Sequence, residues 1–170
     1  MAQVAPQLAG EIESAGTANY HVGDPPDLRS QRAALRRGID LSGLRARQVV
    51  PEDFMRFDLI LAMDRENLRD LQRMRPKVST AELRLFLEYA QHLDTLEVPD
   101  PYYGDDAGFE EVLDLAAAAS RGLIACLQQG SKQPIQGAGK GDGNGQSERP
   151  AAAIRCRKPP HRSKRARPEN

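Results

Sequence analysis

The feature that most constrains this fold is one apolar run, Phe57-Asp58-Leu59-Ile60-Leu61-Ala62-Met63, interrupted only by Asp58. A short run without alternation is typical of a strand buried on both faces, as in a parallel sheet covered by helices. Asp64 follows directly and is a suitable N-cap for a helix running through Met74. Leu83–Leu87 is a second candidate for a buried strand. A strand, a helix and a strand in this order predict a parallel βαβ unit.

Further elements are expected around this unit. Glu11–Ser14 is a short strand candidate, and Pro51–Phe57 is long enough for one or two helical turns. Asp27 is a suitable first residue for a helix that ends at Gly38, and Leu28, Gln31, Ala34 and Leu35 lie at helical spacing along it. The clearest helix is Gly108–Gln128, where one side carries Phe109, Val112, Leu115, Ala119, Leu123 and Cys126 or Leu127. We therefore expect an α/β, three-layer fold in which a small parallel sheet is flanked by helices.

The charge of the chain is unevenly distributed. Residues 131–170 carry ten Lys and Arg against three Asp and Glu, and because the whole chain is neutral, residues 1–130 carry a net charge of −7. From Gly130 onward large apolar residues are scarce, so the segment cannot offset the entropy lost on ordering. We expect one domain over residues 1–130 and a disordered basic C-terminal tail over 131–170.

Composition excludes several classes of protein. Two cysteines exclude a disulfide framework or a multi-cysteine zinc site, and the three histidines lack metal-ligand spacing. No apolar run is long enough for a transmembrane helix, and Met1–Gly10 does not have the pattern of a secretory signal. We expect a cytoplasmic protein with no metal, no cofactor and no membrane partner.

The loop Val98-Pro99-Asp100-Pro101-Tyr102-Tyr103-Gly104 is the segment most informative about function. Two prolines hold the backbone around one carboxylate. A rigid, partly desolvated aspartate beside aromatic residues can act as a general acid, but a proline-flanked turn covered by tyrosines has the same sequence. Ligands of parallel α/β folds bind at the carboxyl ends of strands, where we expect Ser14, Asp64 and this loop.

Seven segments in order resemble the low-molecular-weight protein tyrosine phosphatases from about Gly10 to Leu127: Ser14–Thr17, Tyr20–Gly23, Arg45–Gln48, Glu52–Phe54, Phe57–Asp64, Asn67-Leu68 and Asp100–Gly104. The resemblance implies hydrolysis of phosphotyrosine proteins or small aryl phosphates through a cysteinyl-phosphate, without metal. It implies that Asp100 is the general acid that protonates the leaving phenolate. Tyr102 and Tyr103 match one aromatic side of the substrate slot and Tyr20 matches the facing side. Ser14 matches a serine that hydrogen-bonds the phosphate loop, and Asp64 matches a carboxylate that steadies the arginine of that loop.

The resemblance also implies a central first strand, a phosphate loop and a first helix before Ser14. The loop reads Cys, five residues, Arg, then Ser or Thr, and its backbone N–H groups bind the phosphate oxygens. Met1–Ala9 contains neither Cys nor Arg, and Leu44 stands where the family has a histidine that contacts the loop. We therefore expect a truncated, inactive domain that lacks the central strand and first helix and that folds only partly unless another segment or chain fills the gap.

Neither cysteine of the chain is a convincing replacement for the nucleophile. The segment from Cys156 to Ser163 matches the loop formula, but Pro159 and Pro160 remove two N–H donors and no glycine permits the tight curl. Cys126 falls within the predicted last helix, where a buried and inert thiol is expected.

A second class of function stays open at this point. The chain is alternatively a non-catalytic interaction protein whose basic tail binds nucleic acid or acidic partners, because Arg155–Lys158 and Arg162–Arg167 could contact phosphates. The tail has no aromatic residue for base stacking, so a solvated charge run explains the same pattern.

Overall fold

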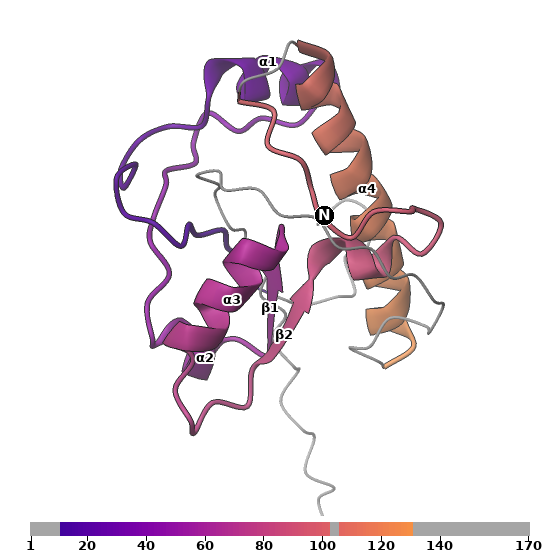
Figure 1. The fold of residues 1–170 in the computed structure, drawn as a ribbon. Coiled ribbons are helices and arrows are strands. Elements are labelled where there is room, and N and C mark those ends of the chain that lie inside the picture. Colours follow the sequence, from indigo (N-terminus) through magenta and orange to yellow (C-terminus); the bar gives the residue numbers. More distant parts are fainter. Residues whose placement is uncertain (1–10, 103–105, 131–170) are drawn as a thin grey trace, which may run out of the picture.

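The computed structural model describes residues 11–102 and 106–130, and its centre is a two-stranded parallel sheet (Figure 1). Strand β1 (Leu59–Ala62) pairs with β2 (Glu82–Leu85), and the register places Leu59 opposite Glu82. Helix α3 (Arg65–Met74) connects the two strands, as the sequence predicts for a βαβ unit. The apolar run thus forms the expected buried strand.

The side chains of β1 alternate between two hydrophobic clusters. Leu59 and Leu61 belong to the cluster with the last helix, α4 (Asp106–Gln128). Ile60 and Ala62 belong to the cluster with α2 (Asp53–Arg56) and α3. All four side chains are fully buried, so the sheet lies between two helical layers and the predicted three-layer α/β class is confirmed.

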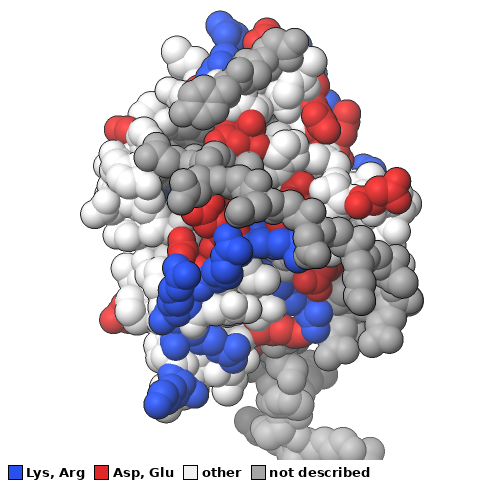
Figure 2. All heavy atoms as spheres, viewed as in Figure 1, with Lys and Arg blue, Asp and Glu red and all other residues white. Residues whose placement is uncertain are grey.

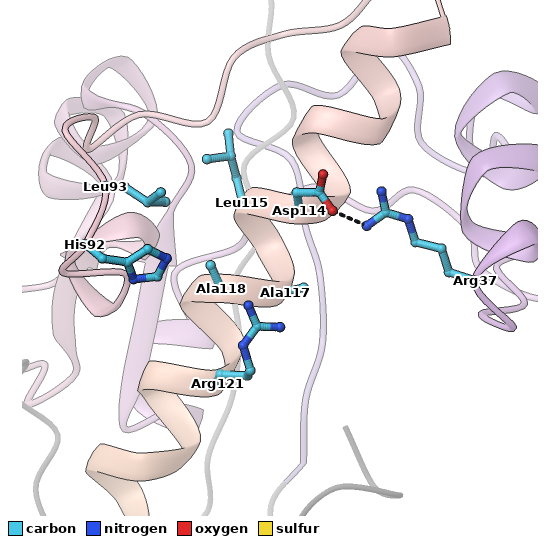
Figure 3. Close-up of a pocket in the computed structure, with 8 residues that line it drawn as sticks. All are labelled: Arg37, His92, Leu93, Asp114, Leu115, Ala117, Ala118 and Arg121. Atoms are coloured by element: carbon cyan, nitrogen blue, oxygen red, sulfur yellow. Dashed lines mark hydrogen bonds and ion pairs between the residues drawn. The ribbon is translucent and has the colours of Figure 1, made fainter.

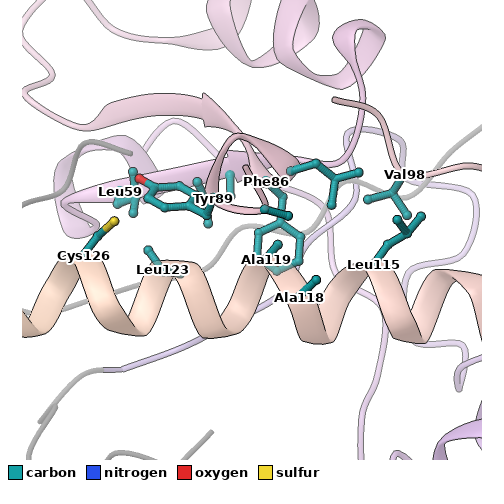
Figure 4. Close-up of a cluster of buried hydrophobic side chains, with 12 residues drawn as sticks. Leu59, Phe86, Tyr89, Val98, Leu115, Ala118, Ala119, Leu123 and Cys126 are labelled. Atoms are coloured by element: carbon teal, nitrogen blue, oxygen red, sulfur yellow. The ribbon is translucent and has the colours of Figure 1, made fainter. Parts of the chain in front are cut away.

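Helix α4 packs closely against the 3-10 helix η1 (Phe86–Tyr89) (Figure 4). The predicted inward side of α4 is confirmed, because Leu115, Ala119 and Leu123 are buried. The predicted strand Leu83–Leu87 is only partly correct: pairing ends at Leu85, and the chain turns into η1, which carries Phe86 and Leu87 into the same cluster.

Helix α1 (Leu28–Arg36) begins and ends as the sequence predicts. Asp27 is the N-cap, its carboxylate accepting a hydrogen bond from the Arg29 amide at 2.7 Å, and Gly38 follows the helix with a positive φ of 73°. The four residues at helical spacing do not form one buried face, however. Leu28 and Leu35 are 70% and 64% exposed, whereas the smaller Ala33 and Ala34 are fully buried. Helix α1 packs against α4, and both leucines lie outside the buried part of α1.

The predicted strand at Glu11–Ser14 is also wrong. Residues 11–15 are irregular, and the only sheet-like contact of this region within the described residues is a parallel bridge between Gly16 and Gln48. Ion pairs fix the segment instead: Arg47 pairs with Glu13 at 2.8 Å, and Arg56 pairs with Glu11. The expected tail at 131–170 lies outside the described residues.

Candidate functional site

The carboxyl end of β1 carries a buried carboxylate. Asp64 is 1% exposed, and its Oδ1 accepts a hydrogen bond from the Asn67 amide at 2.7 Å. This is the N-cap geometry that the sequence predicts, and it satisfies an amide at the start of α3 that has no partner within the helix. Asp64 thus has a fixed orientation at the edge of the sheet where ligands of parallel α/β folds bind.

The Asp100 loop is attached to the same edge. The Val98 amide donates to the carbonyl oxygen of Met63 at 2.8 Å, which places the loop beside the residue that precedes Asp64. One residue earlier, Glu97 pairs with Arg65 of α3 at 3.0 Å. The structure therefore brings the regions of Asp64 and Asp100 together, as the sequence predicts.

The Asp100 carboxylate shapes its own loop. Its Oδ1 accepts a hydrogen bond from the Tyr102 amide at 2.9 Å, which is an Asx turn. The turn suggested by the sequence is therefore present, and it leaves the side chain partly exposed at the edge of the sheet. A turn that fixes a partly exposed carboxylate is compatible with proton donation, so the two interpretations of the loop do not exclude each other.

The predicted aromatic residues occupy two separate segments. Tyr102 is 59% exposed at the end of the Asp100 loop, and Tyr103 lies outside the described residues. Tyr20 is 63% exposed and makes an edge contact with His21, the ring centroids lying 5.7 Å apart. Tyr20 and Tyr102 therefore keep ring surface available to a ligand.

Ser14 lies in the irregular segment before the Gly16–Gln48 bridge and is exposed. Its neighbour Ala15 is buried in the cluster under α3. The Gly16 amide donates to the Arg47 carbonyl at 2.8 Å, and the Val49 amide donates to the Gly16 carbonyl at 2.9 Å. These bonds anchor the chain just after Ser14.

Arg29 connects the Asp100 loop to the rest of the fold, but the sequence does not predict it as a site residue. The guanidinium of Arg29 donates to the Tyr102 carbonyl oxygen at 3.2 Å and lies 4.7 Å from the ring centroid of Phe109. No sequence spacing indicates this contact, because Arg29 and Tyr102 are 73 residues apart.

Cys126 does not lie in a setting suited to a nucleophile. It is 4% exposed on α4, in the cluster with Leu59 and Tyr89. A thiol among apolar side chains is inert. Cys156 lies outside the described residues.

Among residues 11–102 and 106–130, no group of three or more His, Cys, Asp or Glu could hold a metal ion. No helix in the same ranges is long and apolar enough to cross a bilayer.

Cationic side chains gather over α3 (Figure 2). Arg65, Arg69 and Arg73 recur every four residues along this helix and so share one side of it. Arg65 also holds Glu97, which connects this side of α3 to the loop.

A hollow of about 390 Å³ lies along α4 (Figure 3). Its wall includes Arg37, which pairs with Asp114 at 2.6 Å. None of the predicted site residues lines it; the lining residues are Arg37, His92, Leu93, Asp114, Leu115, Ala117, Ala118 and Arg121. This hollow is therefore separate from the Asp64 and Asp100 region.

Comparison with known proteins identifies the family. The family model described as low molecular weight phosphotyrosine protein phosphatase matches residues 1–133. The chain belongs to this family. A Synechocystis protein whose name places it in the same family is 46% identical over 116 residues, which are 68% of this chain and 73% of the relative.

More distant relatives agree with this assignment. The human low molecular weight phosphotyrosine protein phosphatase is 41% identical over 115 residues, 66% of this chain and 72% of the human protein. A crystal structure of a protein tyrosine phosphatase from Entamoeba histolytica, with Hepes in its active site, superposes with a TM-score of 0.65 at 36% identity. The superposition covers 68% of this chain and 74% of that chain, so the phosphatase fold is shared.

Proposed function

We propose that this phosphatase domain binds phosphotyrosine and other aryl phosphate esters at the carboxyl edge of β1, and that Asp100 is its proton donor. The observation that carries the proposal is the Val98–Met63 hydrogen bond of 2.8 Å, which holds the Asp100 loop at that edge beside Asp64. In the reaction that the family resemblance implies, a cysteine thiolate forms a bond to phosphorus as the ester P–O bond breaks, and the Asp100 carboxyl group gives its proton to the departing phenolate oxygen. Proton donation of this kind contributes about 10²–10⁴-fold to a rate.

The aromatic residues have a matching role in this proposal. Tyr102 and Tyr103 line one side of the slot for the aryl ring and Tyr20 lines the other. The exposure of Tyr20 and Tyr102 supports this role, because exposed ring faces can stack on a planar ligand.

Ser14 and Asp64 support the phosphate-binding part of the site in this proposal. Asp64 is buried and oriented at the start of α3, as a carboxylate that steadies an arginine requires. Ser14 stands next to the anchored Gly16 bridge, which limits the positions that its hydroxyl can reach. Both side chains would act on a phosphate loop rather than on the substrate.

We further propose that a polypeptide of these 170 residues does not complete the reaction. No Cys-x5-Arg segment precedes Ser14 in the sequence, and Cys126 is buried in the cluster under α4. The chain then supplies the proton donor and the aryl slot but not the nucleophile or the arginine that grips phosphate.

The test is hydrolysis of p-nitrophenyl phosphate by the 170-residue chain and by its Asp100→Ala, Cys126→Ala and Cys156→Ala variants. We expect no turnover above the buffer rate for any of them. Turnover that disappears in Cys156→Ala would mean that the Cys156 segment is a working phosphate loop. Turnover that disappears only in Asp100→Ala would mean that another nucleophile is present.

The alternative of a non-catalytic protein with a basic tail stays a prediction. We propose the tail, residues 131–170, as a unit separate from the domain at 1–130, on the ground of its ten basic and three acidic residues. Binding to a nucleic acid would have to disappear on deletion of 131–170 and fall steeply with salt. No contact among the described residues favours this function over the phosphatase site.

A further inference from the structure

Arg29 lies between two aromatic rings and a backbone carbonyl. Its guanidinium carbon is 5.5 Å from the ring centroid of Tyr102 and 4.7 Å from that of Phe109, and Nη1 donates to the Tyr102 carbonyl oxygen at 3.2 Å. Asp27 accepts hydrogen bonds from Nε at 3.2 Å and from Nη2 at 3.0 Å. The guanidinium group thus makes hydrogen bonds through its nitrogens and contacts the rings as a planar group, and a lysine ammonium cannot reproduce this combination.

The helix that carries Arg29 is itself fixed to α4. At its C-terminal end, both oxygens of Glu110 accept hydrogen bonds from arginines: Oε1 from Arg36 and Oε2 from Arg37, each at 2.6 Å. Arg37 also reaches Asp114 at 2.6 Å. Helix α1 is therefore attached to α4 at one end and to the Asp100 loop at the other, so Arg29 has a defined position relative to the core.

Asp100 lies midway between the two anchors of its loop. The Val98 amide binds the end of β1, and the Tyr102 carbonyl binds Arg29. The Asp100 carboxylate in turn accepts the Tyr102 amide at 2.9 Å. A displacement of Tyr102 therefore either breaks this hydrogen bond or moves the carboxylate with it, and both outcomes release the Asp100 side chain from its present position.

The same contact prepares the Tyr102 ring for a ligand. A cation over an aromatic ring is attracted to its electron-rich face and restricts its motion. Tyr102 nevertheless keeps 59% of its surface exposed, so ring surface is still available for stacking. A ring held in place loses less conformational entropy when it binds an aryl group.

We infer that Arg29 is a positioning residue that fixes Tyr102 and, through the Asx turn, the Asp100 carboxylate. The aryl ligand in this inference rests on the proposed function, whereas the ordering of Tyr102 by Arg29 does not. Arg29 acts here through Tyr102 and not on the substrate.

The test uses nuclear magnetic resonance on the 170-residue chain with ¹³C-labelled tyrosine and ¹⁵N-labelled backbone. The chain has four tyrosines, and Tyr102→Phe assigns the ring signal of interest. The variants are Arg29→Ala, Arg29→Lys and the matched control Arg32→Ala, which removes another exposed arginine of α1. Each variant is recorded alone and during titration with p-nitrophenol, the aryl leaving group without its phosphate.

In Arg29→Ala we expect the Tyr102 ring and amide signals to move to random-coil positions while the Leu61 amide of β1 keeps its shift. Arg29→Lys should give an intermediate result, because it keeps the cation and loses the fork, and Arg32→Ala should match the wild type. The p-nitrophenol affinity should fall roughly two- to fivefold in Arg29→Ala, the ratio that corresponds to ~0.5–1 kcal/mol for an exposed cation–π contact.

Unchanged Tyr102 signals in Arg29→Ala would overturn the inference, and so would equal effects at Tyr102 and Leu61, since these would mean general loosening of the fold. A wild type whose Tyr102 does not respond to p-nitrophenol would count against the aryl slot of the proposed function. If Tyr102 did not respond to p-nitrophenol but Arg29→Ala still moved the Tyr102 signals to random-coil positions, the positioning role of Arg29 would stand and the aryl slot would not.

Discussion

Gly122 lies where α4 and η1 approach most closely, and replacing it by alanine tests the packing of that contact. A Cβ at this position would lie 1.8 Å from the carbonyl oxygen of Tyr89, well inside the 3.0 Å below which real Cβ contacts essentially never fall. Alanine gains about 1 kcal/mol over glycine in a helix interior, which favours the variant. Overpacking a rigid contact costs about 1–3 kcal/mol, and this clash involves backbone that no rotamer change can relieve.

The two effects oppose each other, and the distance decides between them. Because the clash is with backbone and α4 must move away from η1, the cost falls in the upper part of that range, about 2–3 kcal/mol, and we expect a net loss of about 1–2 kcal/mol in Gly122→Ala. With an m-value of about 2 kcal/mol/M, the urea midpoint should fall by roughly 0.5–1 M.

The assay is urea unfolding followed by far-ultraviolet circular dichroism. Gly108→Ala is the matched control on the same helix, because a Cβ there would meet nothing closer than Pro101 at 3.4 Å. We expect the control to unfold at or slightly above the wild-type midpoint. If Gly122→Ala unfolds at the same midpoint as Gly108→Ala, the close approach to Tyr89 does not exist and the reasoning is refuted.

Three further changes test other parts of the fold. Leu123→Ala empties a fully buried position and should lower the free energy of unfolding by about 2–5 kcal/mol in the same urea assay. Asp64→Ala removes the N-cap of α3 and should cost about 0.5–2 kcal/mol, seen as a lower thermal midpoint with faster amide exchange at Asn67. Hydrogen bonds from Arg36 and Arg37 lower the pKa of the Glu110 carboxyl in the folded protein. The ion pairs of Glu110 therefore stabilise the fold above the pKa of an unfolded glutamate, about 4.3, and this stabilisation is lost as the pH falls through the lower pKa of the folded state. The urea midpoints of wild type and Glu110→Gln should therefore converge between about pH 5 and pH 3, and a constant difference over that range would argue against the ion pairs.

The parts of the fold that local sequence determines could be predicted. The Phe57–Met63 run becomes β1, and Asp64 and Asp27 cap the helices that follow them, because burial on both faces and capping depend on neighbouring residues. Two other features depend on contacts with α4, and the spacing of residues within a segment does not predict such contacts. They are the exposure of Leu28 and Leu35 and the turn from β2 into η1.

In the site, too, features that depend on local sequence or on the fold class could be predicted, and long-range contacts could not. The position of Asp100 at the edge of the sheet followed from the rule for parallel α/β folds, and the roles of Tyr20, Tyr102 and Ser14 followed only from the resemblance. The contact of Arg29 with Tyr102 joins residues 73 apart and could not be found from one sequence. The ion pairs that fix Glu11 and Glu13, in place of the expected strand, belong to the same class of long-range contact.

The central claim is that these residues carry the proton donor and the aryl slot of a tyrosine phosphatase. Its most direct test joins a segment with the family's pattern of Cys, five residues, Arg and Ser or Thr to this chain and measures kcat/KM with and without Asp100→Asn. Because a general acid matters most for a poor leaving group, the substitution should reduce kcat/KM by about 10²–10⁴-fold for phenyl phosphate, and clearly less for p-nitrophenyl phosphate. Equal and small losses for both esters would contradict the assignment of Asp100 as the proton donor.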